Sequence, residues 1–465
     1  MAVSSWRLAR AVSAHGHLGV VSGTALDVVL ARRLQLGDPG GEIRAAIDAF
    51  PDRDLASAVL DQYFVPGGKA DDAPFKSVPM FAARSSRRLH SLAVLSGFVE
   101  VFLAKQGHQG QVGINFLQKV QLPTPSILYG ALLAGVDYVL VGAGIPREIP
   151  GMLDGLLSHA RVEVPLHVAG ASPEDGFTIT FDPSTVLRTA GLAALNRPRF
   201  LAIVSSSTLA ASLVRHGGRV DGFVVEHHVA GGHNAPPRGR MVLNEAGEPS
   251  YGPRDAVDPA RMREIGLPFW LAGGSGEPGG LAQAKQAGAA GIQVGTLFAF
   301  CEESGMDPAL RAAVLSKVRS GDVRVITDPL ASPTGFPFKV VQVDGTLSEA
   351  PVYEARTRRC DLGYLREAYR RPDGTLGYRC PGEPVADYVR KGGAIEETRG
   401  RKCVCNGLLA TVGLGQVREK GIEPAIVTAG AGLMEIARLL RGRDTYSAAD
   451  VIDYLTAAHE RQPQA

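Results

Sequence analysis

The residues best suited to chemistry follow an apolar run, 222–225, in which the chain reads Gly-Phe-Val-Val. Gly231 and Gly232 come soon after it and are followed directly by His233. Two adjacent glycines let a ligand approach the backbone without meeting a Cβ atom, and an imidazole can gain or lose a proton near neutral pH. We therefore predict that His233 is a catalytic acid or base. On this segment alone, a glycine-rich turn with a surface histidine explains the pattern equally well.

Two more glycine-rich turns follow at the ends of apolar runs. Gly273–Gly274 comes after the run 269–272, and Gly295–Thr296 comes at the end of the run 291–294. In (β/α) barrels, backbone N–H groups at such turns and a helix N-terminus hold phosphate dianions. The order strand, glycines, helix, strand, glycine therefore predicts a phosphate site, and this ordered set is more specific than one pair of glycines.

Taken together, these motifs resemble those of the nitronate monooxygenase family, formerly called 2-nitropropane dioxygenases, which also includes FMN-dependent enoyl reductases. The matching motifs are Gly-Gly-His at 231–233, Ala-Gly-Gly at 272–274, Gln-x-Gly-Thr at 293–296 and Glu-Ser at 303–304. Upstream, residues 112–117 are similar to the family's Gly-x-Asn-Leu strand end, and 202–206 resemble its later strand tipped by Ser or Thr.

The resemblance implies a bound FMN and assigns residues to it. It implies that the flavin is contacted by Asn115, Glu226, Gly231, Gly274, Gln293, Val294, Gly295 and Thr296, with its phosphate on the backbone of Gly274, Gly295 and Thr296. Gly231 would give the ring room, and His233 would lie beside the substrate. Glu226, His227 and His228 depart from the family pattern, and a metal site made by all three is disfavoured because adjacent strand residues point to opposite faces.

The activity that the resemblance implies is that of an FMN-dependent oxidoreductase, with three alternatives left open. The first is a nitronate monooxygenase that oxidises an alkyl nitronate with molecular oxygen, in which neutral His233 takes a proton from an acidic carbon. The second is an NAD(P)H-dependent enoyl reductase of fatty-acid or polyketide biosynthesis, acting on an enoyl thioester. The third is a non-catalytic scaffold protein that retains a flavin barrel.

Composition indicates a folded globular chain of 465 residues, since 45% are hydrophobic and only 21% are charged. The net charge of +2 gives no reason to expect a nucleic acid or an anionic membrane as partner. No apolar run reaches the roughly 18 residues that a membrane helix needs, and five cysteines, an odd number, fit a reducing compartment. We therefore predict a cytoplasmic protein with a small-molecule substrate, and leave a homo-oligomer open.

Alternating apolar strands and helices predict a TIM-type (β/α)8 barrel over residues 1–325, with an insertion or lid at 37–95 and a mainly helical extension at 326–465. The expected strands are 18–21, 98–104, 112–117, 137–141, 165–168, 200–204, 222–225, 269–272 and 291–296, and the expected helices include 5–12, 25–36, 126–134 and 281–286. His167 is expected in the core. The family's first strand should end where Met1 stands, so either that strand is missing, which leaves a sheet edge open, or the chain begins late.

The predicted extension contains four of the five cysteines in its segment 360–405: Cys360, Cys380, Cys403 and Cys405. Four thiolates can hold a zinc ion or an iron–sulfur cluster, and we favour a structural zinc between the two. The spacings are wider than those of paired Cys-x-x-Cys knuckles, so ordinary reduced cysteines remain the alternative. Cys301 is expected in the core, the loop at 327–339 is expected to fold back over the pocket, and Lys119 is explained equally well as a solvated cation.

Overall fold

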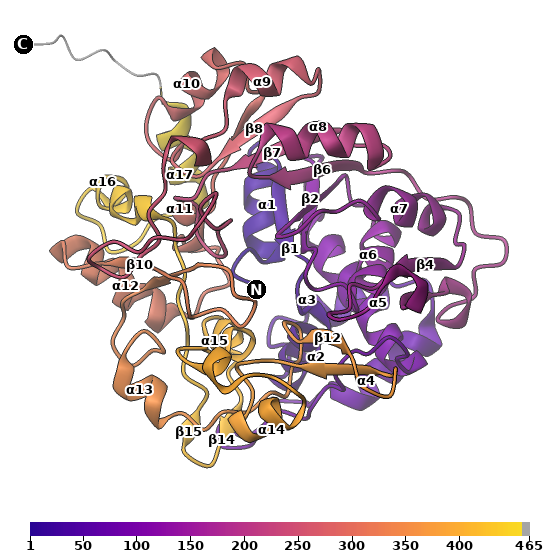
Figure 1. Cartoon of the computed structure of the whole chain (residues 1–465). Coiled ribbons are helices and arrows are strands. Elements are labelled where there is room, and N and C mark those ends of the chain that lie inside the picture. The colour runs from indigo at the N-terminus through magenta and orange to yellow at the C-terminus, as the bar shows by residue number, and fades with distance from the viewer. Residues whose placement is uncertain (458–465) are drawn as a thin grey trace, which may run out of the picture.

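The protein, described here from a computed structural model over residues 1–457, is built around a parallel sheet of seven strands in the order β1-β2-β3-β6-β7-β8-β9 (Figure 1). These strands are β1 (Gly19–Ser22), β2 (Val112–Leu117), β3 (Tyr138–Gly142), β6 (Arg199–Val204), β7 (Gly222–Glu226), β8 (Phe269–Ala272) and β9 (Gly291–Gln293). Every neighbouring pair is parallel, so all seven carboxyl ends lie at the same edge of the sheet. The α/β class predicted from the sequence is confirmed.

Helices connect these strands and lie outside the sheet in Figure 1. Those of the barrel region are α1 (Trp6–Ala14), α2 (Leu26–Gln35), α3 (Glu42–Asp48), α4 (Arg53–Tyr63), α5 (Arg87–Ala104), α6 (Thr124–Leu133), α7 (Ile149–Leu157), α8 (Ser207–His216), α9 (Pro259–Glu264), α10 (Gly280–Gln286), α11 (Thr296–Ala299) and α12 (Pro308–Ser320). The segment 37–95, predicted to be an insertion, holds α3, α4 and the start of α5, all between β1 and β2.

The sheet has seven strands rather than the eight of the predicted closed barrel, and β1 and β9 are its two ends within residues 1–457. Residues before α1 occupy the side of β1 where another strand would pair. Ser22 donates its N–H to the carbonyl of Ser4 (2.9 Å), and Gly305 donates its N–H to the carbonyl of Val3 (2.7 Å). The edge that we expected to be open is thus partly covered by the N-terminal residues, as Figure 1 shows.

The prediction of a strand at 98–104 was wrong, because these residues form the last part of helix α5. Residues 92–99 of α5 are all buried, so no polar face interrupts the apolar run. A helix that is apolar on all sides carries no 3.6-residue period and cannot be told from a buried strand by pattern alone.

The strand predicted at 165–168 was also wrong, since the chain there leaves the main sheet. β4 (Val162–Pro165) pairs antiparallel with β5 (Thr178–Phe181) in a separate two-stranded sheet. His167 lies just beyond β4 and is exposed rather than buried in the core, and its N–H donates to the side-chain oxygen of Gln121 (3.0 Å). Alternation of apolar residues in a hairpin imitates a barrel strand in sequence.

The C-terminal extension contains three short hairpins besides its helices, which the sequence did not predict. Its elements are β10 (Val325–Asp328), β11 (Phe338–Val341), α13 (Ala350–Ala355), β12 (Glu367–Arg370), β13 (Leu376–Arg379), α14 (Val385–Arg390), α15 (Val404–Ala410), β14 (Val417–Arg418), β15 (Gly421–Ile422), α16 (Ile436–Leu440) and α17 (Ala448–Thr456). The last helix is capped by Ser447, which accepts a hydrogen bond from the N–H of Asp450. Cys301 is buried in the core between this extension and the barrel region, as predicted.

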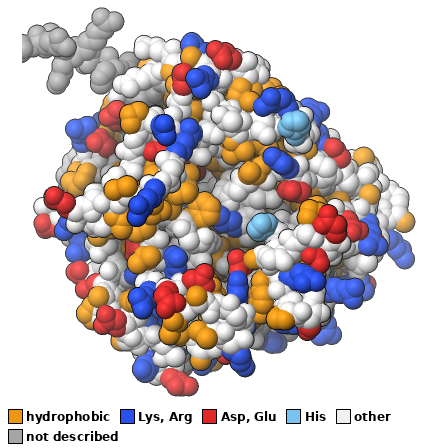
Figure 2. All heavy atoms as spheres, viewed as in Figure 1, with side chains coloured by type: hydrophobic (Ala, Val, Ile, Leu, Met, Phe, Trp, Pro, Cys, Tyr) orange, Lys and Arg blue, Asp and Glu red, His pale blue; other side chains and the backbone are white. Residues whose placement is uncertain are grey.

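The apolar length of the helices and the charge of the surface both bear on the partners that the composition disfavours. None of the helices within residues 1–457 combines the length and apolar character that crossing a bilayer requires. Figure 2 shows positive and negative side chains interspersed over the viewed face, in keeping with the net charge of +2.

Candidate active site

The ends of β7, β8 and β9 form one row of the sheet. Glu226 is paired in register with Ala272, and Ala272 with Gln293. Residues in register on parallel strands point to the same face, and Ala272 belongs to the small apolar cluster of the sheet's inner face, together with Leu140. Asn115 on β2 is paired with Leu140. The structure therefore brings Asn115, Glu226 and Gln293, all predicted site residues, to the inner face.

Gly274 and Gly295 follow two of these strands and leave open space above the sheet edge. Gly273 and Gly274 have φ values of +82° and +83°, a region that favours glycine. A Cβ atom on Gly295 would meet no heavy atom within 4 Å, and one on Gly274 would meet only the Val229 side chain at 3.5 Å. Both glycines are exposed, and Gly295 precedes α11. A ligand phosphate can therefore reach the backbone at both turns.

Gly231 has a different role from the one we expected. A Cβ atom there would lie 2.9 Å from the backbone of both Ala429 and Gly430, so the glycine makes room for the C-terminal extension. Gly232 donates its N–H to the hydroxyl of Thr428 (2.8 Å), and the N–H of Gly430 donates to the hydroxyl of Thr296 (2.8 Å). Segment 428–430 thus holds the Gly-Gly-His turn against the predicted phosphate site.

His233 is held on two sides by the segment between β10 and β11, so the loop predicted at 327–339 does fold back over the site. The Nε2 atom of His233 lies 2.6 Å from the hydroxyl of Ser332, and its ring meets Phe338 edge-on at 4.8 Å between centroids. The Nδ1 atom has no hydrogen-bond partner among residues 1–457, yet it is not one of the fully buried unpaired atoms. Nδ1 is therefore the ring nitrogen left open to a ligand.

Lys119 lies near His233 and is not the solvated cation that the sequence allowed. Its Nζ atom is buried, has no hydrogen-bond partner among the described residues, and lies 2.9 Å from the centroid of the Phe336 ring. Burial lowers the pKa of Lys119 to about 7. Burial, and next the charge of Lys119, lower the pKa of His233 to about 3. The imidazole is therefore neutral at physiological pH.

Glu226 and the two following histidines form the remaining polar part of the site. Burial raises the pKa of Glu226 to about 7, so this carboxyl group holds its proton far more readily than an exposed glutamate. His228 stacks on Tyr251 with 4.0 Å between ring centroids and 7° between planes, and burial lowers the pKa of both His227 and His228. Stacking on Tyr251 explains the position of the His228 ring.

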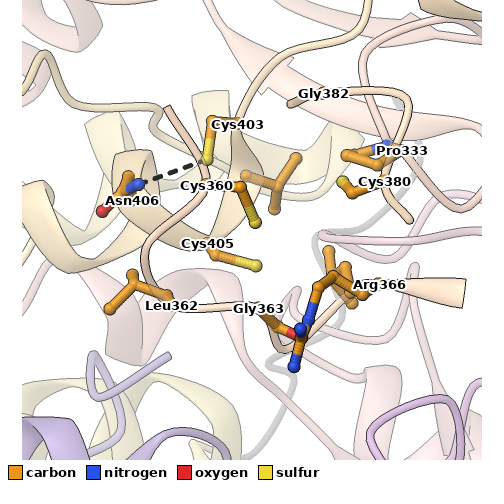
Figure 3. A pocket seen from close by; sticks show the side chains of 12 residues that line it. Pro333, Cys360, Leu362, Gly363, Arg366, Cys380, Gly382, Cys403, Cys405 and Asn406 are labelled. Carbon is orange, nitrogen blue, oxygen red and sulfur yellow. Dashed lines mark hydrogen bonds between the residues drawn. The ribbon is translucent and has the colours of Figure 1, made fainter. Parts of the chain in front are cut away.

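The four cysteines of the extension line one buried cavity, although they are far from the sheet edge in sequence (Figure 3). All five cysteines of the chain are free thiols. Nowhere in residues 1–457 do three His, Cys, Asp or Glu side chains stand in an arrangement that could hold a metal ion. The predicted gathering of Cys360, Cys380, Cys403 and Cys405 is thus found, but the expected zinc site is not supported.

Ser332, Phe336 and Thr428 were missed by sequence reasoning. They lie about a hundred to two hundred positions beyond His233 and carry no motif of their own. The proline, glycine and aromatic residues of 329–338 were the only indication that this loop covers a pocket.

A search against protein families matches residues 182–329 to the family described as nitronate monooxygenase. A nitronate monooxygenase of Paraburkholderia phytofirmans is 27% identical over 190 residues, covering 40% of this chain and 49% of that protein. A probable nitronate monooxygenase of Staphylococcus haemolyticus is 26% identical over 162 residues, covering 33% of this chain and 43% of that protein. The resemblance stated from the strand-end motifs is thereby confirmed, while the chain spans less than half the length of these relatives.

Two solved structures align with nearly the whole chain at low similarity. FabK from Thermotoga maritima covers 97% of this chain and 88% of its own, at 15% identity and a TM-score of 0.46. A nitroalkane oxidase from Streptomyces ansochromogenes covers 98% of this chain and 92% of its own, at 16% identity and a TM-score of 0.42.

Proposed function

We propose that the protein is an FMN-dependent oxidoreductase that oxidises a small alkyl nitronate with molecular oxygen. The observation that carries this proposal is the position of His233, a neutral imidazole with one open nitrogen, beside two exposed glycine turns at the carboxyl edge of the sheet. The family match over residues 182–329 contains His233 and both glycine turns.

The glycine turns fit a flavin phosphate. Open space at Gly295 and Gly274 gives a phosphate access to backbone N–H groups, and the hydroxyl of Thr296, which accepts a hydrogen bond from Gly430, keeps its own O–H free to donate. Asn115, Glu226 and Gln293 share the inner face on which the ring would lie, with Val294 directly after Gln293. Bound FMN would supply the two-electron chemistry and the reaction with oxygen.

His233 then acts on the substrate as a base. The hydrogen bond at Nε2 fixes the ring, and when Nε2–H donates to Ser332, the lone pair of Nδ1 is free to take the acidic carbon proton of a neutral nitroalkane, which forms the nitronate that is then oxidised. An enoyl reductase needs a proton donor at this position instead, and a histidine whose pKa is about 3 is a poor one. The same low pKa makes the imidazole a weak base, so the preference for the nitronate reaction rests on the family match over residues 182–329 rather than on protonation.

Lys119 supports an anionic substrate. A buried ammonium group without a partner is costly, and the free energy of burying it falls when an anion binds next to it. A nitronate carries its negative charge on two oxygens, so it can supply that partner. We infer that Lys119 faces the nitronate oxygens while His233 faces the carbon.

The experiment that tests this proposal is the visible spectrum of the purified full chain, first under air and then without oxygen. We expect a flavin spectrum, release of FMN on denaturation, and anaerobic bleaching by ethyl nitronate alone. Bleaching only by NADH or NADPH would favour the enoyl reductase. A protein that cannot be loaded with FMN would contradict both enzyme functions and favour the scaffold.

A further inference from the structure

The thiol cavity is formed by three segments of the C-terminal extension that are distant in sequence (Figure 3). Cys360 lies in the loop after α13, Cys380 directly follows β13, and Cys403 and Cys405 lie at the start of α15. The cavity has a volume of about 10 Å³, room for about one water molecule. Four thiols therefore surround a space too small for an iron–sulfur cluster.

Cys360 and Cys380 line this cavity together. The Cys380 thiol donates a hydrogen bond to the sulfur of Cys360, and this bond, helped by the Arg366 guanidinium, lowers the pKa of Cys360 despite its burial. The pKa of Cys380 is raised by the same bond, and burial raises those of Cys403 and Cys405. Cys360 is thus the one of the four whose pKa is lowered, so it forms a thiolate more readily than its neighbours, and thiolates are the nucleophilic form of cysteine.

Cys360 is also the one thiol of the four that reaches a second, open cavity of about 410 Å³. That cavity is lined by four cationic side chains, Arg358, Arg359, Arg366 and Lys391, against two anionic ones, Glu383 and Asp387. The excess of positive charge around this cavity stabilises a thiolate on Cys360. Cys380, Cys403 and Cys405 are buried and line only the inner cavity. An oxidant arriving from solvent therefore meets Cys360 first.

We propose that Cys360 and Cys380 form a redox-active pair, in which Cys360 reacts with a hydroperoxide and Cys380 closes the disulfide. The Cys360 thiolate attacks one peroxide oxygen, so an S–O bond forms, the O–O bond breaks, and the leaving hydroxide takes up a proton to become water. Cys380 then attacks the sulfur of the sulfenic acid, so the S–S bond forms and a second water leaves. Two thiols and one hydrogen peroxide thus give one disulfide and two waters.

The thiol cavity adjoins the loop that holds His233. Pro333 lines the thiol cavity, and its neighbour Ser332 bonds His233. Lys402, next to Cys403, donates its N–H to the carbonyl of Ala331 (2.9 Å). The inference does not depend on the flavin chemistry proposed above, because the thiols react whether or not FMN is bound.

The test is oxidation of the reduced full chain with one equivalent of hydrogen peroxide, followed by thiol counting and peptide mapping without reductant. We expect the loss of two of the five thiols and one linked pair of peptides, Cys360 with Cys380. Cys380→Ser should leave a sulfenic acid on Cys360 that a cyclic 1,3-diketone traps. Cys360→Ser should slow thiol loss by about tenfold or more.

Cys301→Ser is the matched control, because Cys301 is buried outside the cavity and its loss should leave the linked pair unchanged. Cys360→Ala repeats the test with a smaller side chain should Cys360→Ser fail to fold. A disulfide that joins any other pair, or no thiol loss with peroxide, would overturn the proposal. One equivalent of zinc released by thiol modification would overturn it as well, in favour of a metal site.

Discussion

The sheet-edge site and the thiol cavity treat charge in opposite ways. At the sheet edge, burial removes charge: the pKa of His233 falls to about 3, that of Lys119 falls to about 7, and that of Glu226 rises to about 7. At the thiol cavity, the interaction with Cys380 and the Arg366 guanidinium lower the pKa of Cys360, while the pKa values of its three neighbours are raised. The first arrangement suits proton transfer, and the second selects one nucleophile.

Burial alone therefore does not decide the protonation of side chains in this protein. Cys360 and His233 are both largely removed from water, but only Cys360 has a donor and a cation aimed at the atom that carries the charge. Lys119 lies near His233, and the charge of its protonated form further disfavours the charged form of the imidazole. The following variants test whether the sheet-edge site and the thiol cavity behave independently.

The largest effect is expected from Gly295→Phe, which should abolish FMN binding. The backbone of Gly295 has φ −112° and ψ −52°, which other residues adopt freely, and the new side chain would enter only open space. Loss of the flavin spectrum would then come from occupation of the phosphate site rather than from misfolding. Gly151→Phe is the control, since Gly151 also faces open space, but on α7. Peroxide oxidation of Cys360 should be unchanged in both, and a Gly295→Phe protein that keeps its flavin would contradict the phosphate assignment.

A second, smaller effect is expected on stability from Glu226→Gln. Burial raises the pKa of Glu226 from 4.5 to about 7, so between these pH values the unfolded chain has lost a proton that the folded chain keeps. The free energy of unfolding of the wild type therefore falls as pH rises through that interval, and glutamine, which cannot ionise, avoids the loss. We expect the variant to gain about 1 to 2 kcal/mol relative to wild type at pH 8, after allowance for partial exposure, and almost nothing at pH 4.

Urea unfolding of both proteins at the two pH values measures this difference. Glu245→Gln, a substitution at an exposed glutamate, is the control and should show no pH-dependent gain. An equal gain at pH 4 and pH 8 would show that packing rather than ionisation is responsible, and would remove the protonated carboxyl group from the description of the sheet edge.

The smallest effect is expected from Ser332→Ala, which removes one hydrogen bond to His233. Loss of a bond worth about 1 kcal/mol should lower kcat with nitroethane by about fivefold and leave KM nearly unchanged, because the ring loses orientation and the substrate contacts remain. Ser320→Ala, at an exposed serine near the end of α12, is the control. The variant should oxidise at Cys360 as fast as wild type. A changed oxidation rate would break the comparison, since it would show that the loop couples the two regions.

How much of the molecule the sequence could predict depended on how local each feature is. Glu226 and Gln293 end their strands, Asn115 lies near the end of β2, and parallel strands bring their ends together, so their common face followed from the order of elements. The role of Gly231 did not follow, because the segment that contacts it, 429–430, lies two hundred residues further along the chain. The partner of His233, Ser332, was missed for the same reason.

Misassigned elements have a related cause. Helix α5 is buried on nearly all sides between α2 and α6, so its C-terminal half shows no polar stripe and was taken for a strand. The cysteines show the reverse case. Their spacings gave no geometry, and only the packing of three segments of the extension shows that all four line one cavity.

The role of His233 as a base is tested by the rate at which nitroethane, the neutral nitroalkane, bleaches the flavin without oxygen in wild type and in His233→Asn. Asparagine keeps a polar group near the same place but cannot act as a base. We predict that the variant binds FMN as well as wild type and that its bleaching rate falls by about two orders of magnitude or more. Equal rates at equal flavin content would remove His233 from the mechanism and contradict this account of the site.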